Sequence, residues 1–240
     1  MEIYEGTLKL FLLKDIFNCN YQEKIAAIID KSFTVTEEMK NFHHRNGQKG
    51  YVFNGFFDRN KKDKDFKYPQ GNVYSVRIRS LSKDLMIFFK NNLSKVRTEE
   101  MQALTFDYRT LPNTTVKTIY SITPAICKFE DGYWRNSHTL NDVEKRIEQN
   151  ARKKLELVNI TLPENIEFIT NLKKLNSYPI VREYNKKATN ENRKIKLLCD
   201  KFEFEISPDE NSQKLARAII GAGLLEMNAR GFGYVNVKTI

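Results

Sequence analysis

The order of strand-like and helix-like segments repeats along the chain, and this repeat constrains the fold more than any other feature. In the first half, apolar alternation predicts strands, and apolar spacing of three and four residues predicts amphipathic helices. The strands are expected at residues 2–13, 51–57, 73–80 and 104–109, and the helices at 21–33 and 82–93, the latter capped by Ser82. Charged residues 58–71 are expected to form a hairpin tip. The resulting order is β-α-β-β-α-β.

Pro112 and Asn113 interrupt the chain, and the same order then returns. In the second half, strands are expected at 116–129, 166–172, 179–184, 195–206 and 234–238, and helices from Asn141 onward and at 210–220. The spacing of Asn141 and Glu144 predicts a capping box. The sequence therefore predicts an α+β protein made of two tandem ferredoxin-like (βαββαβ, RRM-like) domains, residues 1–112 and 115–240.

Positive charge is spread over both predicted domains. The formal net charge is +10, with 19 Lys and Arg against 14 Asp and Glu in residues 1–114, and 21 against 16 in residues 115–240. A basic excess on a folded body, rather than on a tail, is expected where a polyanion such as RNA lies across both domains. The alternative is ordinary solvated surface.

Cysteine usage and the start of the chain indicate the compartment. The 3 cysteines are far apart, which favours reduced thiols and argues against structural zinc. The first residues are acidic, and the apolar run 10–13 is too short to target or span a membrane. We expect a cytoplasmic protein without a membrane partner.

Glycines cluster near the C-terminus, at Gly221, Gly223, Gly231 and Gly233, with Phe232 between the last two. Glycine lets backbone N–H groups approach an anion closely, so this segment is a candidate RNA-phosphate loop together with Arg230. A dinucleotide fingerprint does not fit, because it needs a strand before the glycines and a helix after them. A plain tight turn between a helix and a strand is an equally good explanation.

Further candidate RNA contacts are basic residues clustered on predicted elements. They lie on the strand at 73–80, on the helix after Asn141 and on a predicted basic hairpin at 182–196. They are Arg77 and Arg79; Arg152, Lys153 and Lys154; and Arg182, Lys186, Lys187, Arg193 and Lys194. Phosphate contacts would supply most of the affinity for RNA. For any single one of them, solvated surface is the alternative.

The candidate catalytic residues are His43, His44 and Lys49, which follow the first helix. Histidine exchanges protons near neutral pH, and lysine supplies fixed positive charge. The two adjacent rings point in different directions, so one at most faces the reacting group, and His43 is favoured. A role for both as exposed loop residues remains open, as does a surface role for Lys49. His138 precedes a helix and is expected at the surface.

The two halves, the glycine segment and the run from Phe42 to Phe53 together resemble the CRISPR-associated endoribonucleases that cut precursor CRISPR RNA within each repeat. These enzymes belong to the repeat-associated mysterious protein (RAMP) superfamily. The resemblance covers the whole chain and includes Ser121–Pro124 and Asp131–Trp134. Family members often have a second glycine and a basic residue in the glycine loop, where this chain has Leu225 and Met227.

The resemblance implies metal-independent RNA cleavage by the 2′-OH, leaving a 2′,3′-cyclic phosphate and a 5′-OH, with no cofactor and no metal. The implied partners are precursor and mature CRISPR RNA, a CRISPR effector complex and a second copy of the chain. One alternative is a non-catalytic RNA-binding subunit of the same superfamily. Another is an unrelated RNA-binding protein that stacks bases on Tyr51, Phe53, Phe56 and Phe57.

Overall fold

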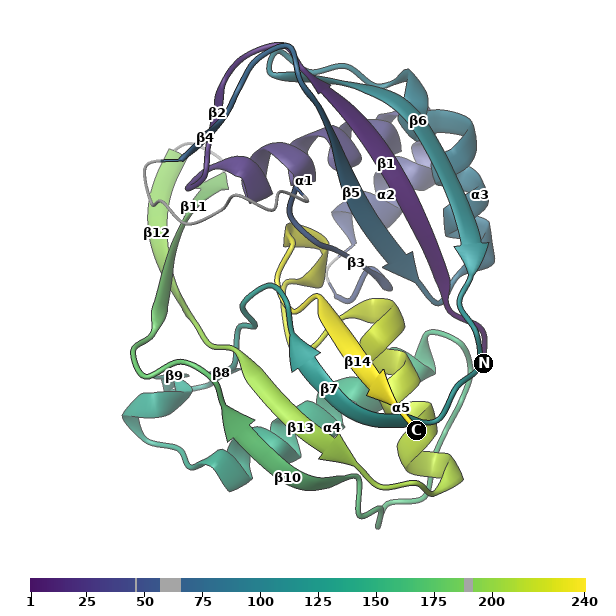
Figure 1. Cartoon of the computed structure of the whole chain (residues 1–240), viewed down its shortest axis with the longest axis vertical. Helices are drawn as coiled ribbons and strands as arrows, with labels where there is room; N and C mark the ends of the chain where they lie inside the picture. Colours follow the sequence, from purple (N-terminus) through teal and green to yellow (C-terminus); the bar gives the residue numbers. More distant parts are fainter. Residues whose placement is uncertain (46, 57–65, 188–191) are drawn as a thin grey trace.

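The computed structural model describes residues 1–45, 47–56, 66–187 and 192–240, and the side chains of all of these except 185–187 and 192–194 (Figure 1). The described chain is a mixed α+β fold with antiparallel sheets and five α-helices. Within the described residues, no helix has the length and apolarity to cross a bilayer.

The first half forms a four-stranded antiparallel sheet in the order β3-β5-β1-β6. Its strands are β1 (Tyr4–Leu12), β3 (Tyr51–Phe53), β5 (Val73–Ser80) and β6 (Met101–Thr110). The central strand β1 pairs with both β5 and β6. Gly6 in β1 allows the ring of Phe106 to lie across it, since a Cβ at Gly6 would stand 2.1 Å from that ring.

The second half forms a second four-stranded antiparallel sheet in the order β10-β13-β7-β14. Its strands are β7 (Val116–Ser121), β10 (Ile169–Lys174), β13 (Phe202–Ile206) and β14 (Val235–Thr239). Three two-stranded pieces lie outside the main sheets. They pair β2 (Ile16–Phe17) with β4 (Lys67–Tyr68), β8 (Lys128–Phe129) with β9 (Gly132–Tyr133), and β11 (Ile180–Lys187) with β12 (Asn192–Cys199).

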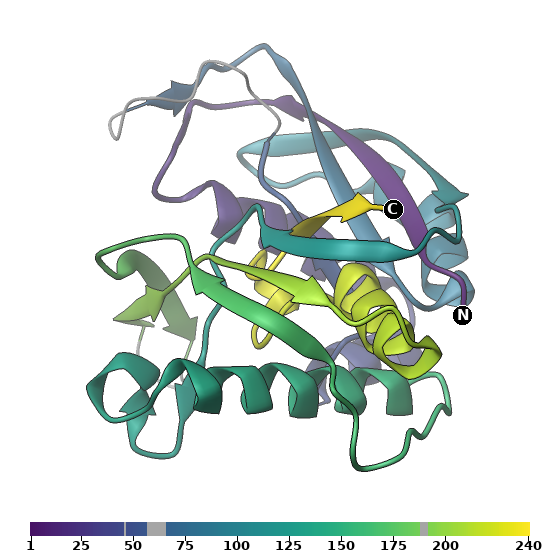
Figure 2. The same cartoon turned by 60° about the horizontal axis from the view of Figure 1, so that its bottom comes forward.

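The helices are α1 (Tyr21–Ser32), α2 (Glu37–His44), α3 (Lys83–Asn92), α4 (Leu140–Glu156) and α5 (Glu210–Ala222). All the helices except α2 bury apolar stripes, whereas α2 packs only the partly buried Met39 and Phe42 against the first core. Figure 2 shows α4 running along one side of the second sheet, with α5 beside it. A buried stripe on α4 (Val143, Ile147, Ala151 and Leu155) matches the periodicity read from the sequence.

Each half has its own apolar core, and the two cores interlock. Ile3 and Leu81, from the first half, belong to the core of the second half. Ala229, from the second half, packs against the core of the first. Arg79 joins the sheets, because its guanidinium donates to the Val235 carbonyl at 2.7 Å and to Asn236 Oδ1 at 3.2 Å.

Several predicted elements need correction. The capping box of α4 is formed by Thr139 and Asp142, whose side chain and backbone bond reciprocally, and not by Asn141 and Glu144. The expected strand 195–206 is split into β12 and β13, because Asp200, which lies between them, pairs instead with Ala125. The expected strand 116–129 ends at Ser121, before Pro124, and β3 is shorter than predicted. The residues 57–65 of the expected hairpin tip lie outside the described part.

The aromatic residues of β3 do not form an exposed stacking surface. Tyr51 is 2% exposed, Phe53 0% and Phe56 4%. The alternative that these rings stack on RNA bases is therefore wrong for Tyr51, Phe53 and Phe56, because they belong to the apolar core of the first half. Phe57 lies outside the described residues.

Candidate functional site

Helix α2 places His43 and His44 in its last turn. The helix begins at Thr36, whose hydroxyl accepts from the Met39 N–H at 3.3 Å. At its other end, Lys49 Nζ donates to the Phe42 carbonyl at 2.6 Å and to the Arg45 carbonyl. An ammonium on terminal carbonyls satisfies acceptors that have no partner within the helix. Lys49 therefore ties the helix that carries both histidines to the chain that follows.

His43 lies in a partly enclosed position, and His44 is exposed. The side chain of His43 is 25% exposed, its ring stacks on Phe33 with centroids 5.8 Å apart, and its Nδ1 lies 3.5 Å from Asp30 Oδ1. The two histidine rings lie 5.3 Å apart at 64°. A carboxylate facing Nδ1 favours a hydrogen there and leaves the lone pair on Nε2. Of the two rings, His43 has the arrangement of an oriented proton acceptor.

Arg230 reaches the same carboxylate from the other half of the chain. It lies within the glycine segment, in the 3₁₀ turn Asn228–Arg230, which packs against α1 and β3 (Figure 1). Its guanidinium pairs with Asp30 Oδ2. Asp30 thus contacts His43 with one oxygen and Arg230 with the other. The tertiary structure brings His43, Lys49 and Arg230 together near Asp30. The sequence predicted the first three as site residues, but it did not predict Asp30.

The electrostatics favour a neutral His43. Burial lowers the pKa of His43 below its ordinary value; Arg230, His44 and Lys49 lower it further, and Asp30 opposes them. Burial also lowers the pKa of Lys49, helped by Arg45 and Arg230. Because the His43 pKa lies below its ordinary value, the ring is mostly uncharged at neutral pH. An uncharged, oriented imidazole can accept a proton.

Replacing Arg230 by alanine is expected to raise the pKa of His43. The substitution removes a positive charge that disfavours imidazolium and leaves the Asp30 carboxylate, which favours it, unopposed. An NMR titration of the His43 ring in the intact protein measures the shift. Arg230→Lys keeps a cation near Asp30 and serves as the control, with a smaller change. A His43 pKa that falls in Arg230→Ala contradicts this electrostatic picture.

The glycines of the C-terminal segment are packed inside the protein. Gly221 lies in α5, where a Cβ would stand 2.3 Å from Leu81 Cδ2. The N–H groups of Gly223, Gly231 and Gly233 donate to the carbonyls of Ile219, Asn228 and Pro124. The prediction that these N–H groups bind phosphate is therefore wrong for those three residues in this conformation. Phe232, predicted as an RNA contact, is 3% exposed.

Buried side chains hold this segment in place. Lys154 is 1% exposed and donates to the carbonyls of Gly223 and Leu225, the second at 2.9 Å. Burial lowers the pKa of Lys154 to about 7. The prediction of Lys154 as an RNA contact is wrong, because its buried ammonium already donates to the loop carbonyls. Leu225 and Met227 both have a φ of 57°, so they keep a left-handed backbone, which glycine adopts more easily.

The other basic residues predicted to contact RNA fall into two groups: those already bonded to protein groups and those exposed to solvent. Arg79 is 6% exposed and bonds to Glu5 at 2.8 Å, so its prediction as an RNA contact is corrected. Arg152 is held by Glu148 and by the carbonyls of Leu162 and Glu164. The side chains of Arg77 and Lys153 are exposed, and Arg182 is half-buried on β11. The side chains of Lys186, Lys187, Arg193 and Lys194 lie outside the described part.

Asp30 was missed by reasoning from the sequence, although a signal was present. It lies in the last turns of α1, where the helix dipole disfavours an acidic side chain. An acid in that position, beside an apolar stripe, indicates a compensating partner elsewhere. The partners, His43 and Arg230, are brought to it by folding alone. Among the described residues, no group of three or more His, Cys, Asp or Glu is placed to hold a metal ion.

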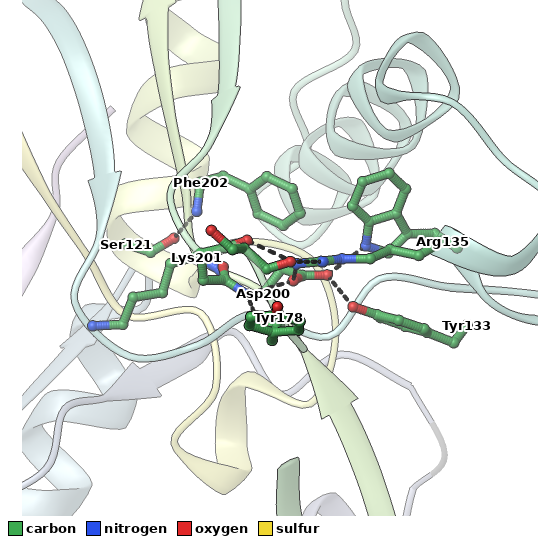
Figure 3. Close-up of polar contacts among 10 residues, drawn as sticks. Ser121, Tyr133, Arg135, Tyr178, Asp200, Lys201 and Phe202 are labelled. Carbon is green, nitrogen blue, oxygen red and sulfur yellow. Dashed lines mark hydrogen bonds and ion pairs between the residues drawn. The ribbon is translucent and has the colours of Figure 1, made fainter. Parts of the chain in front are cut away.

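A second buried carboxylate organises the start of β13 and the turn before β11 (Figure 3). Asp200 is 1% exposed and accepts from Tyr133 Oη at 2.5 Å, Trp134 Nε1 at 2.6 Å and Asn176 Nδ2 at 2.8 Å, and it pairs with Arg135. These donors come from segments on both sides of α4. The cluster is structural, because each of these four donors bonds to the one buried carboxylate of Asp200.

Comparison with known proteins gives a structural relationship only. No family model and no curated protein matches the chain. Solved structures do match. A CRISPR-associated protein Cas6 has 18% identity and a TM-score of 0.68, over 99% of this chain and 100% of that one.

Two more structures agree with the first over nearly full lengths. An RAMP protein described as binding different RNA substrates has 15% identity and a TM-score of 0.67, covering 98% of this chain and 99% of that one. The product of a Cas6-related gene from Pyrococcus furiosus has 16% identity and a TM-score of 0.63, covering 98% of each chain. The chain therefore has, over nearly its whole length, the fold of Cas6 and RAMP proteins, as the resemblance read from its sequence implied.

Proposed function

We propose that the protein is a metal-independent endoribonuclease that cleaves precursor CRISPR RNA within its repeats. The observation that carries this proposal is the arrangement of His43 between Asp30, Arg230 and Lys49. It occurs in a chain with the fold of Cas6 proteins. An oriented, neutral imidazole next to fixed positive charge suits RNA cleavage by the neighbouring 2′-OH.

In this reaction His43 is the base. Its Nε2 accepts the proton of the 2′-OH while the 2′-oxygen attacks the adjacent phosphorus and the bond to the 5′-oxygen breaks. Lys49 uses two of its three N–H donors on carbonyls at the end of α2, and the third is left to stabilise the negative charge that develops on the phosphorane. His44, exposed beside His43, is placed to give a proton to the leaving 5′-oxygen. The products are a 2′,3′-cyclic phosphate and a 5′-OH.

The open side of the sheets supplies positive charge for RNA. Arg77 and Arg109 lie 4.0 and 3.4 Å from the carboxylate of Glu5, and both line a cavity of about 320 Å³. Their side chains are 50% and 73% exposed. The buried Arg79 already pairs with Glu5 at 2.8 Å. The two exposed arginines therefore supply charge for phosphate binding.

The strand order supports two ferredoxin-like domains at residues 1–112 and 115–240. In each half, the strands of the main sheet stand in the spatial order second, third, first, fourth. A helix follows the first strand and another follows the third. This is the arrangement of a βαββαβ unit. The shared positions of Ile3, Leu81 and Ala229 explain why the two domains would form one body.

Incubation of the protein with a repeat RNA in EDTA tests the function. We expect one cut, with a cyclic phosphate on the upstream product. Replacing the 2′-OH next to that cut by hydrogen removes the nucleophile, so we expect binding without cleavage. Cleavage of the deoxy substrate, or an absolute requirement for Mg²⁺, contradicts the mechanism. Binding of an all-ribose repeat without any cut indicates a non-catalytic RNA-binding subunit instead.

A further inference from the structure

A cavity of about 390 Å³ lies between the two halves, next to the candidate site. It is formed by the segment after α2, by one side of α4 and by the loop that follows α5. Lys49 lines it, so it adjoins the group that holds the end of α2. Volumes of this size are typical of sites for small ligands.

Three buried polar atoms on the residues that line this cavity have no hydrogen-bond partner within the described part. They are Gln48 Oε1, Asn150 Oδ1 and Arg146 Nε. Asn150 is 7% exposed. Buried polar atoms are almost always paired, because an unpaired one is destabilising. Two acceptors and one donor without partners, on three residues that line one cavity, indicate a ligand that supplies complementary groups once these side chains turn toward it.

The charges on the cavity favour an anion. Lys49, Lys153 and Arg146 line it with one acid, Glu226, which pairs with Arg146. Lys153 is exposed, and no carboxylate of the described residues lies within ion-pair distance of it. A ligand with both a hydrogen-bonding edge and a negative charge fits these groups. A nucleotide has both.

We propose that this cavity binds one unpaired nucleotide whose base carries an exocyclic amino group. The amino group donates to Gln48 Oε1 and Asn150 Oδ1, an acceptor on the base faces Arg146 Nε, and the phosphate lies toward Lys153. Uracil fits poorly, because it presents carbonyl oxygens where adenine and cytosine present an amino group. The inference rests on the proposed function, because the nucleotide belongs to the RNA that His43 cleaves.

Titration of the intact protein with AMP, CMP and UMP, followed by calorimetry, tests the site without any cleavage. We expect AMP or CMP to bind about tenfold or more tightly than UMP, the scale of a good base contact. In Asn150→Leu this preference should disappear. Gln149→Leu changes the neighbouring exposed amide on α4, outside the cavity, and should keep it. Equal binding of the three nucleotides, tighter UMP binding or no binding overturns the proposal.

Two further measurements show whether a lost nucleotide preference comes from unfolding, and whether the bound nucleotide occupies an RNA site. A melting curve of Asn150→Leu shows whether the variant folds; since it removes an unpaired buried oxygen, we expect no loss of stability. If it unfolds, Gln48→Met takes its place in the titration. Repeat RNA should displace the bound nucleotide, and failure to displace it overturns the assignment to RNA. Nucleotide selectivity without RNA cleavage refutes the nuclease alone, whereas cleavage without selectivity refutes the cavity alone.

Discussion

Replacement of His43 by alanine is expected to lower the single-turnover rate of repeat cleavage about 10²–10⁴-fold, the usual contribution of one positioned proton-transfer group. His43 is the ring that Asp30 orients and that Phe33 holds. His44→Ala should have a smaller effect, because water can protonate the leaving oxygen. RNA affinity should change little in either variant, since the chemistry is lost and the phosphate contacts remain.

The pH dependence gives an independent check on His43. Its pKa is lowered, so the neutral, reactive form should predominate down to pH values below about 6.5, the ordinary midpoint. The rising limb of the wild-type pH–rate profile should therefore have its midpoint below that value. Gel assays at saturating protein measure both results. A double variant, His43→Ala with His44→Ala, that cuts at the wild-type rate would place the active site elsewhere.

Replacement of Asp200 by alanine is expected to destabilise the fold by about 3–5 kcal/mol, the usual effect of breaking a buried ion pair. The change leaves the Arg135 guanidinium without its carboxylate, and the donors on Tyr133, Trp134 and Asn176 without an acceptor. Burial opposes ionisation of Asp200, but these hydrogen bonds outweigh it, so the pKa lies below its ordinary value.

Urea unfolding at neutral pH measures this loss. Asp107→Ala is the control, because its carboxylate is 78% exposed and its pair with Lys90 should contribute about 1 kcal/mol at most. The folded pKa of Asp200 is depressed, so its stabilisation is present above about pH 4 and is lost as the pH falls through the folded value. An Asp200→Ala protein as stable as Asp107→Ala contradicts the structural role of the cluster.

Periodicity predicted the main sheets well, because their strands alternate between a buried and an open face. Short elements without such alternation were missed. Helix α2 contains no fully buried residue, and β2 and β4 have two residues each. None of them therefore produces a periodic pattern of apolar residues in the sequence. The split between β12 and β13 was also missed, since Asp200, which separates them, is held by donors more than 20 residues away.

The site was predicted in part for a similar reason. Histidine is scarce in the chain, so the pair at 43 and 44 stood out, and Lys49 lay close to it in sequence. Basic residues were harder to interpret. Arg79 and Lys154 look like RNA contacts in the sequence, yet each is buried and bonded to backbone carbonyls. A count of charges cannot distinguish a solvated cation from one that closes a loop.

By itself, the sequence determined the order of the main-sheet strands and of the helices that bury an apolar stripe, together with the basic character of both halves and the position of the histidines. These depend on residue type and local spacing. Only the tertiary structure decided which groups meet. Asp30 and Arg230 are 200 positions apart, and their contact exists because the interlocked cores bring the turn within the glycine segment against α1. Burial then sets the protonation of His43, and burial is a property of the whole fold.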